Sequence, residues 1–212
     1  MSILNTAADN LMKEVIDYYV SGDYTKPFSS EELADCVIAH AAAAGLAAIA
    51  GCVVPGVGAG IAVTVSTVAV WRMYIKMAQI IGTPMKEKTL KAIASAAISN
   101  IAMNAAVLLV VSFLPVVGTV ACGVINFASV YIAGLIFLTT FTRLFKVRRK
   151  DINDISNEEW VENVKEAIEN INMKKIAKEA ISLFSDLHES GRLEQLGRDV
   201  DISDDGFDDD DD

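Results

Sequence analysis

A run of 51 residues without a single charged side chain, Ala92–Thr142, constrains this chain more than any other feature. Pro115 divides the run into segments of 23 and 27 residues. A helix of about 20 residues crosses the hydrocarbon core of a bilayer, so both segments are long enough to span a membrane. A second uncharged run, Cys36–Trp71, is divided by Pro55 into segments of 19 and 16 residues.

The two proline breaks belong to a tandem repeat with an offset of 60 residues. Pro55 aligns with Pro115, Val57 with Val117 and Gly58 with Gly118. Proline ends the helix before it, and glycine permits the positive φ that a tight reversal requires. The repeat therefore predicts two helical hairpins, with turns formed by Pro55, Gly56, Gly58, Pro115 and Gly118.

Charged residues gather at the two ends of the chain and predict amphipathic helices there. Residues 1–35 carry seven acids, residues 143–212 carry twenty, and the stretch between them carries only Glu87. The segment 6–20 places Leu11, Val15, Tyr18 and Tyr19 on one helical stripe. Ser29 with Glu32 and Ser156 with Glu159 have the spacing of capping boxes, each of which begins a helix.

The C-terminal part predicts two amphipathic helices with a break near Asn172, followed by a disordered acidic tail. The first stripe contains Trp160, Val161, Val164, Ile168 and Ile171, and the second contains Ile176, Ala180, Leu183, Phe184 and Leu187. The predicted organisation is an N-terminal helix and linker (1–28), a hairpin domain (29–146), C-terminal helices (147–198) and the tail (199–212).

Two interpretations compete for the apolar middle: a membrane domain of two hairpins, or a soluble all-α core. We favour the membrane domain, because a soluble domain of this size has too much surface to hide four apolar helices. Lysine and arginine flank the hairpins, whereas the turns are uncharged, which predicts cytoplasmic N- and C-termini. The first hairpin has a short second arm, so it is the better candidate for a re-entrant, non-spanning segment.

Small and polar residues within the apolar helices are candidates for helix packing. Small residues four apart let helices approach closely in lipid, although an ordinary alanine-rich helix gives the same pattern. Asparagines there favour interhelical hydrogen bonds over a substrate path, because no ionisable partner accompanies them. The candidate packing residues are Gly60, Cys122, Gly123, Asn126, Asn100 and Asn104.

Residues 114–146, LPVVGTVACGVINFASVYIAGLIFLTTFTRLFK, resemble the hallmark segment of a domain of unknown function. That domain occurs in YcjF-like membrane proteins and behind the G domain of some bacterial Era-like GTPases. The matching positions are Pro115, Val117, Gly118, Gly123, Ile125 and Asn126. Val116 stands where the family usually has glycine, and the first repeat lacks the acidic residue that often follows its turn. The resemblance covers residues 36–146 and implies a membrane-associated helical module that works beside a GTPase.

The sequence predicts neither an enzyme nor a metal or cofactor site. It has no GxxxxGK[ST] motif, and its GxGxG at Gly56–Gly60 lacks the strand and the acid of a dinucleotide loop. His40 and His188 have no ligand partners at metal spacing. The three cysteines are interpreted as small apolar packing residues of a protein in a reducing compartment. No lysine- or arginine-rich face suits nucleic acid.

Three functions fit these features. The first is a membrane-embedded interaction or scaffold protein, oligomeric through its small-residue faces, that presents its C-terminal helices to a cytoplasmic partner such as a separate GTPase. The second is a pore-forming or toxin-like protein that inserts hydrophobic hairpins into a bilayer. A small channel or transporter is the third, and the lack of charge within the apolar helices disfavours ion coupling.

Overall fold

A computed structural model describes residues 2–19, 29–51, 58–82, 85–103, 119–148 and 155–200. These residues form an all-helical fold and contain no strand. The helices are α1 (Ile3–Tyr19), α2 (Ser30–Gly51), α3 (Gly58–Ile81), α4 (Glu87–Met103), α6 (Thr119–Arg148), α7 (Asn157–Asn170), α8 (Met173–Glu189) and α9 (Arg192–Arg198).

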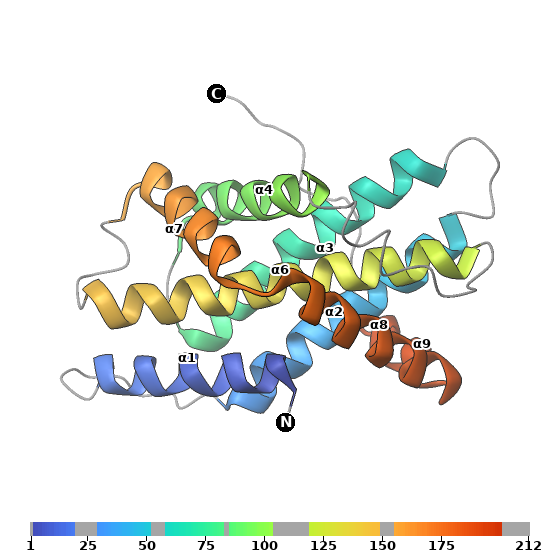
Figure 1. Ribbon diagram of the computed structural model, residues 1–212, viewed down its shortest axis with the longest axis horizontal. Helices are drawn as coiled ribbons and strands as arrows, with labels where there is room; N and C mark the ends of the chain where they lie inside the picture. Colours follow the sequence, from blue (N-terminus) through green and yellow to red (C-terminus); the bar gives the residue numbers. More distant parts are fainter. Residues whose placement is uncertain are drawn as a thin grey trace.

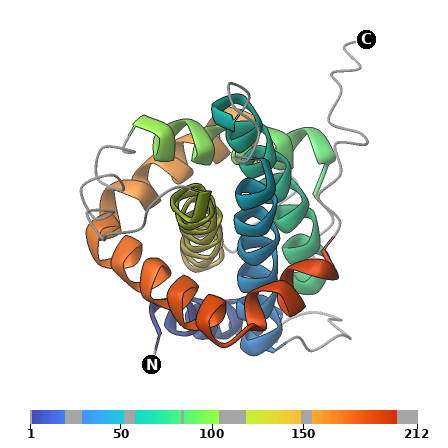
Figure 2. The same cartoon turned by 90° about the vertical axis from the view of Figure 1, so that its right-hand side faces the viewer.

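The longest helix, α6, forms the axis of the fold. Figure 2 looks along α6, which lies inside a ring made by α1, α2, α3, α4, α7 and α8. Each of these six helices contacts α6, and α9 packs outside the ring against α2. One apolar core cluster extends from Leu4 to Leu193, so the N- and C-terminal helices share a core with the apolar middle of the chain.

Helices α2 and α3 lie side by side and run in opposite directions (Figure 1). In Figure 1, α2 runs toward the end of the molecule at which α3 and α6 begin, and α3 runs back beside α2. Gly58 is the first residue of α3. The other expected turn residues, Pro55, Gly56, Pro115 and Gly118, lie outside the described residues.

The predicted helix starts are confirmed by their capping hydrogen bonds. The Glu32 N–H donates to Ser29 Oγ at 3.0 Å, and the Glu159 N–H donates to Ser156 Oγ at 3.2 Å. The break near Asn172 is confirmed as well, because the Lys175 N–H donates to Asn172 Oδ1 at 3.0 Å where α8 begins. Each side-chain oxygen satisfies an N–H that has no partner within its own helix.

Two glycines in left-handed conformations mark helix boundaries. Helix α3 continues beyond Trp71 to Ile81, where Gly82 with a φ of 76° ends the helix. After Glu189, a short further helix, α9, follows Gly191, whose φ is 71°. Glycine adopts both left-handed conformations without the strain that a side chain would cause.

Close contact between α2 and α6 explains how so short a chain covers a long apolar helix. A Cβ added at Gly123 would lie 3.0 Å from the Gly45 carbonyl oxygen, and one added at Gly134 would lie 2.6 Å from Val37 Cγ1. Glycine at these positions lets the two helix backbones approach. At these two positions the backbones of α2 and α6 come close together, so α2 covers this part of α6 without large side chains between them.

We expect Gly134→Ala to lower the free energy of unfolding by about 1–2 kcal/mol, because the new methyl group overpacks a β-branched, stiff Val37. The double variant Gly134→Ala/Val37→Ala should recover much of that loss, since the clash is gone and alanine is the better helix former. Urea unfolding of the two single variants and the double variant measures this coupling. Additive losses would contradict the close approach of α2 and α6.

Candidate functional site: an apolar helix under a cover

Two helices of the described chain, Ser30–Gly51 and the segment Val120–Lys146 of α6, are long and apolar enough to cross a membrane. Length and composition alone support this statement, because the core helix of a soluble protein has the same properties. In α6 the side chains of residues 120–145 are buried or half-buried, and Lys146 is exposed. The most membrane-like helix is thus enclosed by the rest of the chain.

Three amphipathic helices, α1, α7 and α8, close one side of α6, and we call them the cover. They place Leu11, Trp160 and Phe184 in the core, each at most 1% exposed. Phe137 and Phe141 of α6 stack at 4.1 Å between ring centroids, and Trp160 of α7 lies 5.0 Å from Phe141. Aromatic pairs at these distances stabilise a core beyond the area they bury.

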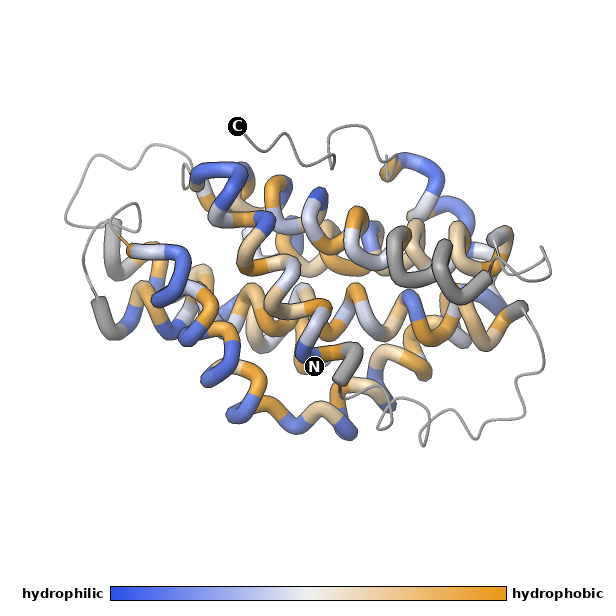
Figure 3. The backbone as a smooth tube through the Cα atoms, turned by 90° about the horizontal axis from the view of Figure 1, so that it is seen from above, coloured by the Kyte–Doolittle hydropathy of each residue, from blue (hydrophilic) through white to orange (hydrophobic). Residues whose placement is uncertain are grey.

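The outer surface of the described residues is polar. Hydrophilic and hydrophobic residues alternate along the peripheral helices in Figure 3, as expected for helices with one wet face. Among the described side chains, Ile16 at 51% exposure is the one large apolar group that is exposed. A helix bundle embedded in lipid would instead present an apolar belt. We call this arrangement, in which the cover lies over α6, the closed form.

A single carboxylate oxygen connects the cover to α6. Glu179 Oε1 of α8 accepts a hydrogen bond from the Ile3 backbone N–H of α1 and another from the Tyr131 hydroxyl of α6, both at 2.8 Å. The Glu166 carboxylate of α7 also pairs with Arg143 of α6. Hydrogen bonds to charged groups contribute more than neutral ones, so Glu179 is a junction of three helices.

Five polar side chains on α6 are bonded within the helix itself. Each donates to the carbonyl oxygen four residues earlier, at 2.7–2.9 Å. Such bonds stay with the helix in any environment, including one without water. The donors are Asn126, Ser129, Thr139, Thr140 and Thr142.

The predicted packing residues have several different environments. Asn126 is buried and accepts a hydrogen bond from Ser66 of α3, which confirms an interhelical bond. Asn100 donates to the Ala96 carbonyl of its own helix at 2.7 Å, and Gly123 lies at the α2–α6 contact. Cys122 is disulfide-bonded, so the expectation of an unpaired packing cysteine was wrong there. Gly60 is in the first turn of α3, and Asn104 lies outside the described residues.

Sequence reasoning missed Glu179, Tyr131 and Ser66. Ser66 precedes Asn126 by 60 residues, the same offset that relates the two prolines, so the repeat itself could have identified this pair. No local signal distinguishes Glu179 from the other acids of the C-terminal helices. Glu179 bonds to Ile3 and to Tyr131, which are 176 and 48 positions away from it in the sequence.

Cys36 and His40 lie on one face of α2, beside α3. His40 Nδ1 is 2.8 Å from the Cys36 carbonyl oxygen and 3.7 Å from Cys36 Sγ. Burial raises the pKa of the Cys36 thiol to about 12, and burial lowers the pKa of His40 below its ordinary value of 6.5. Both groups are therefore neutral near pH 7. Among the described residues, no three histidine, cysteine or acidic side chains come together as a metal site.

The lowered pKa of His40 predicts a loss of stability in mild acid. The unfolded chain binds a proton at this ring near pH 6.5, whereas the folded chain resists it, so stability falls as the pH drops below that value. The slope approaches about 1.4 kcal/mol per pH unit until the folded ring is protonated too.

We expect His40→Gln to flatten the pH dependence of urea unfolding between pH of about 7 and about 5.5, above the range in which most carboxylates titrate. His188→Gln is the matched control, because His188 is exposed at the end of α8. An unchanged slope in His40→Gln would show that the ring is not buried as a neutral group beside Cys36 and Lys76.

Comparisons of the chain with protein-family models, with curated proteins and with solved structures find no match. The resemblance to the YcjF-like domain therefore stays a hypothesis that rests on the residues quoted above.

Proposed function

We propose that this protein inserts into lipid bilayers and that the closed form is its state before insertion. In this proposal the cover moves away from α6, and α6 enters the bilayer with the uncharged segment that precedes it. The carrying observation is that a span-length helix lies under three amphipathic helices, while the described surface exposes one large apolar side chain. The proposed class is the pore-forming or toxin-like proteins with concealed hydrophobic hairpins.

The chemistry of α6 supports its assignment as the inserting helix. Five of its polar side chains donate to their own backbone, so insertion leaves those bonds intact. In contrast, the span-length stretch of α2 begins with Glu31, Glu32 and Asp35. We propose that α2 stays at the surface.

Insertion of one hairpin per chain implies an oligomer. Two helices do not enclose an aqueous path, so leakage requires several copies around a common centre. The embedded scaffold with a GTPase partner is a proposal with weaker support. It rests on the family resemblance. The apolar faces of α7 and α8 pack inside the closed form, so a partner would have to bind the polar faces of these two helices.

The test is dye release from lipid vesicles by protein purified without detergent. We expect release by the wild-type chain and strong loss of release in Ser129→Asp, because a carboxylate at the middle of a spanning helix costs about 2.5–3.5 kcal/mol, roughly 100-fold. Ser129 is half-buried in α6, so circular dichroism and a thermal melt must first confirm that the variant folds.

Ser182→Asp provides the matched control, because Ser182 lies on the exposed face of α8. It should release dye like the wild-type chain. A wild-type protein that leaves cells only in detergent, or that neither floats with vesicles nor releases dye, would overturn the proposal.

A further inference from the structure

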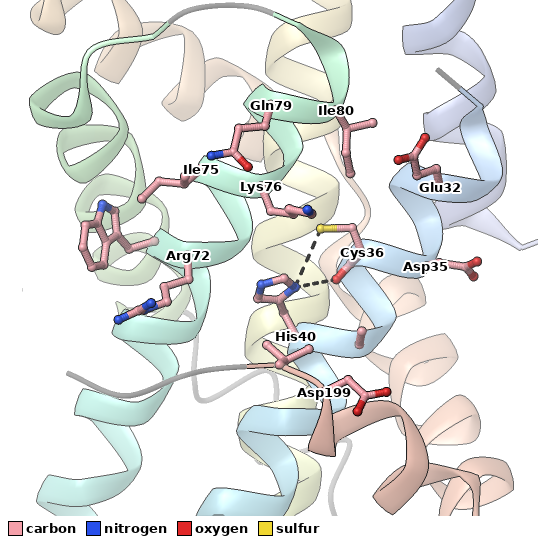
Figure 4. A pocket seen from close by; sticks show the side chains of 13 residues that line it. Glu32, Asp35, Cys36, His40, Arg72, Ile75, Lys76, Gln79, Ile80 and Asp199 are labelled. Atoms are coloured by element: carbon pink, nitrogen blue, oxygen red, sulfur yellow. Dashed lines mark hydrogen bonds between the residues drawn. The ribbon is translucent and has the colours of Figure 1, made fainter. Parts of the chain in front are cut away.

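A cleft between α2 and α3 is not used by the proposed insertion of α6. Its volume is about 580 Å³, a size typical of small-molecule sites. Figure 4 shows its two walls, α2 with Cys36 and His40 on one side and α3 with Lys76 on the other. Asp199 and Val200, which follow α9, complete the lining.

The two walls carry opposite charges. Arg72 and Lys76 project from α3, whereas Glu32 and Asp35 belong to α2 and Asp199 lies beside it. Lys76 and Glu32 also act in opposite directions on one atom, since Lys76 lowers and Glu32 raises the pKa of the Cys36 thiol. Positive and negative charge therefore face the same point of the cleft from opposite sides.

The floor of the cleft is neutral and offers a hydrogen-bond acceptor. Because a carbonyl oxygen only accepts, His40 Nδ1 carries the proton that it donates to the Cys36 carbonyl. The second ring nitrogen, Nε2, then has a free lone pair, and in Figure 4 it points away from Cys36 toward the α3 wall. Trp71, Ile75 and Ile80 supply apolar surface around these polar groups.

We propose that this cleft binds a small zwitterion, in which a short apolar linker joins an ammonium group to a phosphate or carboxylate. The anionic group lies against Lys76 of α3, and the ammonium group lies against Glu32 of α2. A simple anion would meet the carboxylates of α2, and a simple cation would meet Lys76, so only a ligand with both charges pairs with both walls. A phospholipid headgroup and a free solute share this chemistry.

Calorimetric titration of the full chain with O-phosphoethanolamine tests the proposal, with inorganic phosphate and ethanolamine as its two halves. We expect the zwitterion to bind at least about 10-fold more tightly than either half, since each half leaves one charged wall unpaired. Lys76→Gln should remove the advantage over ethanolamine, and Glu32→Gln should remove the advantage over phosphate. Lys174→Gln and Glu169→Gln alter exposed charges on α8 and α7 and should change nothing.

Vesicles with and without phosphatidylethanolamine identify the source of the ligand. Binding to phosphatidylethanolamine vesicles that free O-phosphoethanolamine displaces supports a lipid headgroup, and binding of the free zwitterion alone supports a solute. The proposal is overturned if phosphate binds as tightly as the zwitterion and Glu32→Gln preserves that binding, or if no titrant gives saturable heat. The calorimetric titrations with soluble ligands do not involve α6, so their failure is distinct from a failure of dye release.

Discussion

Replacing Phe141 with alanine is expected to lower the free energy of unfolding by about 3–5 kcal/mol, which is a fall in Tm of roughly 10 °C for a chain of this size. Phe141 is fully buried, and its ring stacks on Phe137 and packs against Trp160 of the cover. The substitution removes the ring that joins α6 to α7 and leaves a cavity, and thermal and urea unfolding in detergent-free buffer measure the loss.

Ile16→Ala is the matched control, because it also removes apolar atoms, but from a side chain that is 51% exposed on α1. Surface changes of this kind usually stay within about 0.5 kcal/mol. A loss in Phe141→Ala no larger than the loss in Ile16→Ala would mean that Phe141 does not face a protein core. Helix α7 would then not cover α6 at Phe141.

Replacing Glu179 with alanine is expected to favour opening of the cover. The variant leaves the Ile3 N–H and the Tyr131 hydroxyl without their shared acceptor, and hydrogen bonds to a charged group contribute about 1.5–3 kcal/mol. A change of that size shifts the equilibrium between closed and open forms roughly 10- to 100-fold. Dye release at a fixed protein concentration should rise accordingly, and hydrogen exchange in α1 should speed up.

Glu179→Gln separates the hydrogen bonds from the charge. Both donors bond to Oε1, and the glutamine side chain keeps a carbonyl oxygen at that position but loses the charge, so its dye release should lie between those of the wild-type chain and the alanine variant. Equal release by the alanine and glutamine variants would show that the charge of Glu179, and not its hydrogen bonds, controls opening. No increase in either variant would remove Glu179 from the opening step.

Local signals in the sequence predicted the helices and their starts well. Ser29 and Ser156 mark helix starts because a capping hydroxyl and its N–H partner are three residues apart, a relation that sequence contains directly. The long helix after Pro115 follows equally from its uncharged run. The uncharged run ending at Trp71 does not show how far α3 extends, because the helix continues to Ile81 through charged residues such as Arg72 and Lys76.

The enclosure of α6 could not be predicted in the same way. An apolar helix has the same composition in a bilayer and in a protein core, so the decision depends on which distant helices pack against it. Gly45, Gly123 and Gly134 let the backbones of α2 and α6 approach each other closely. Amphipathic helices from both ends of the chain cover the other side of α6. The sequence does not predict the hydrogen bonds of Glu179 either, since they join helices that are far apart in the chain.

The depth of α6 in a bilayer tests the central claim most directly. A fluorescent probe on Ser129→Cys reports the middle of α6, and the same probe on Ser182→Cys reports the exposed face of α8. When vesicles with brominated acyl chains are added, we predict quenching of the probe at position 129 and none at position 182. Protein that is bound to vesicles with the probe at 129 still unquenched would contradict the account, because α6 would then stay under its cover at the membrane surface.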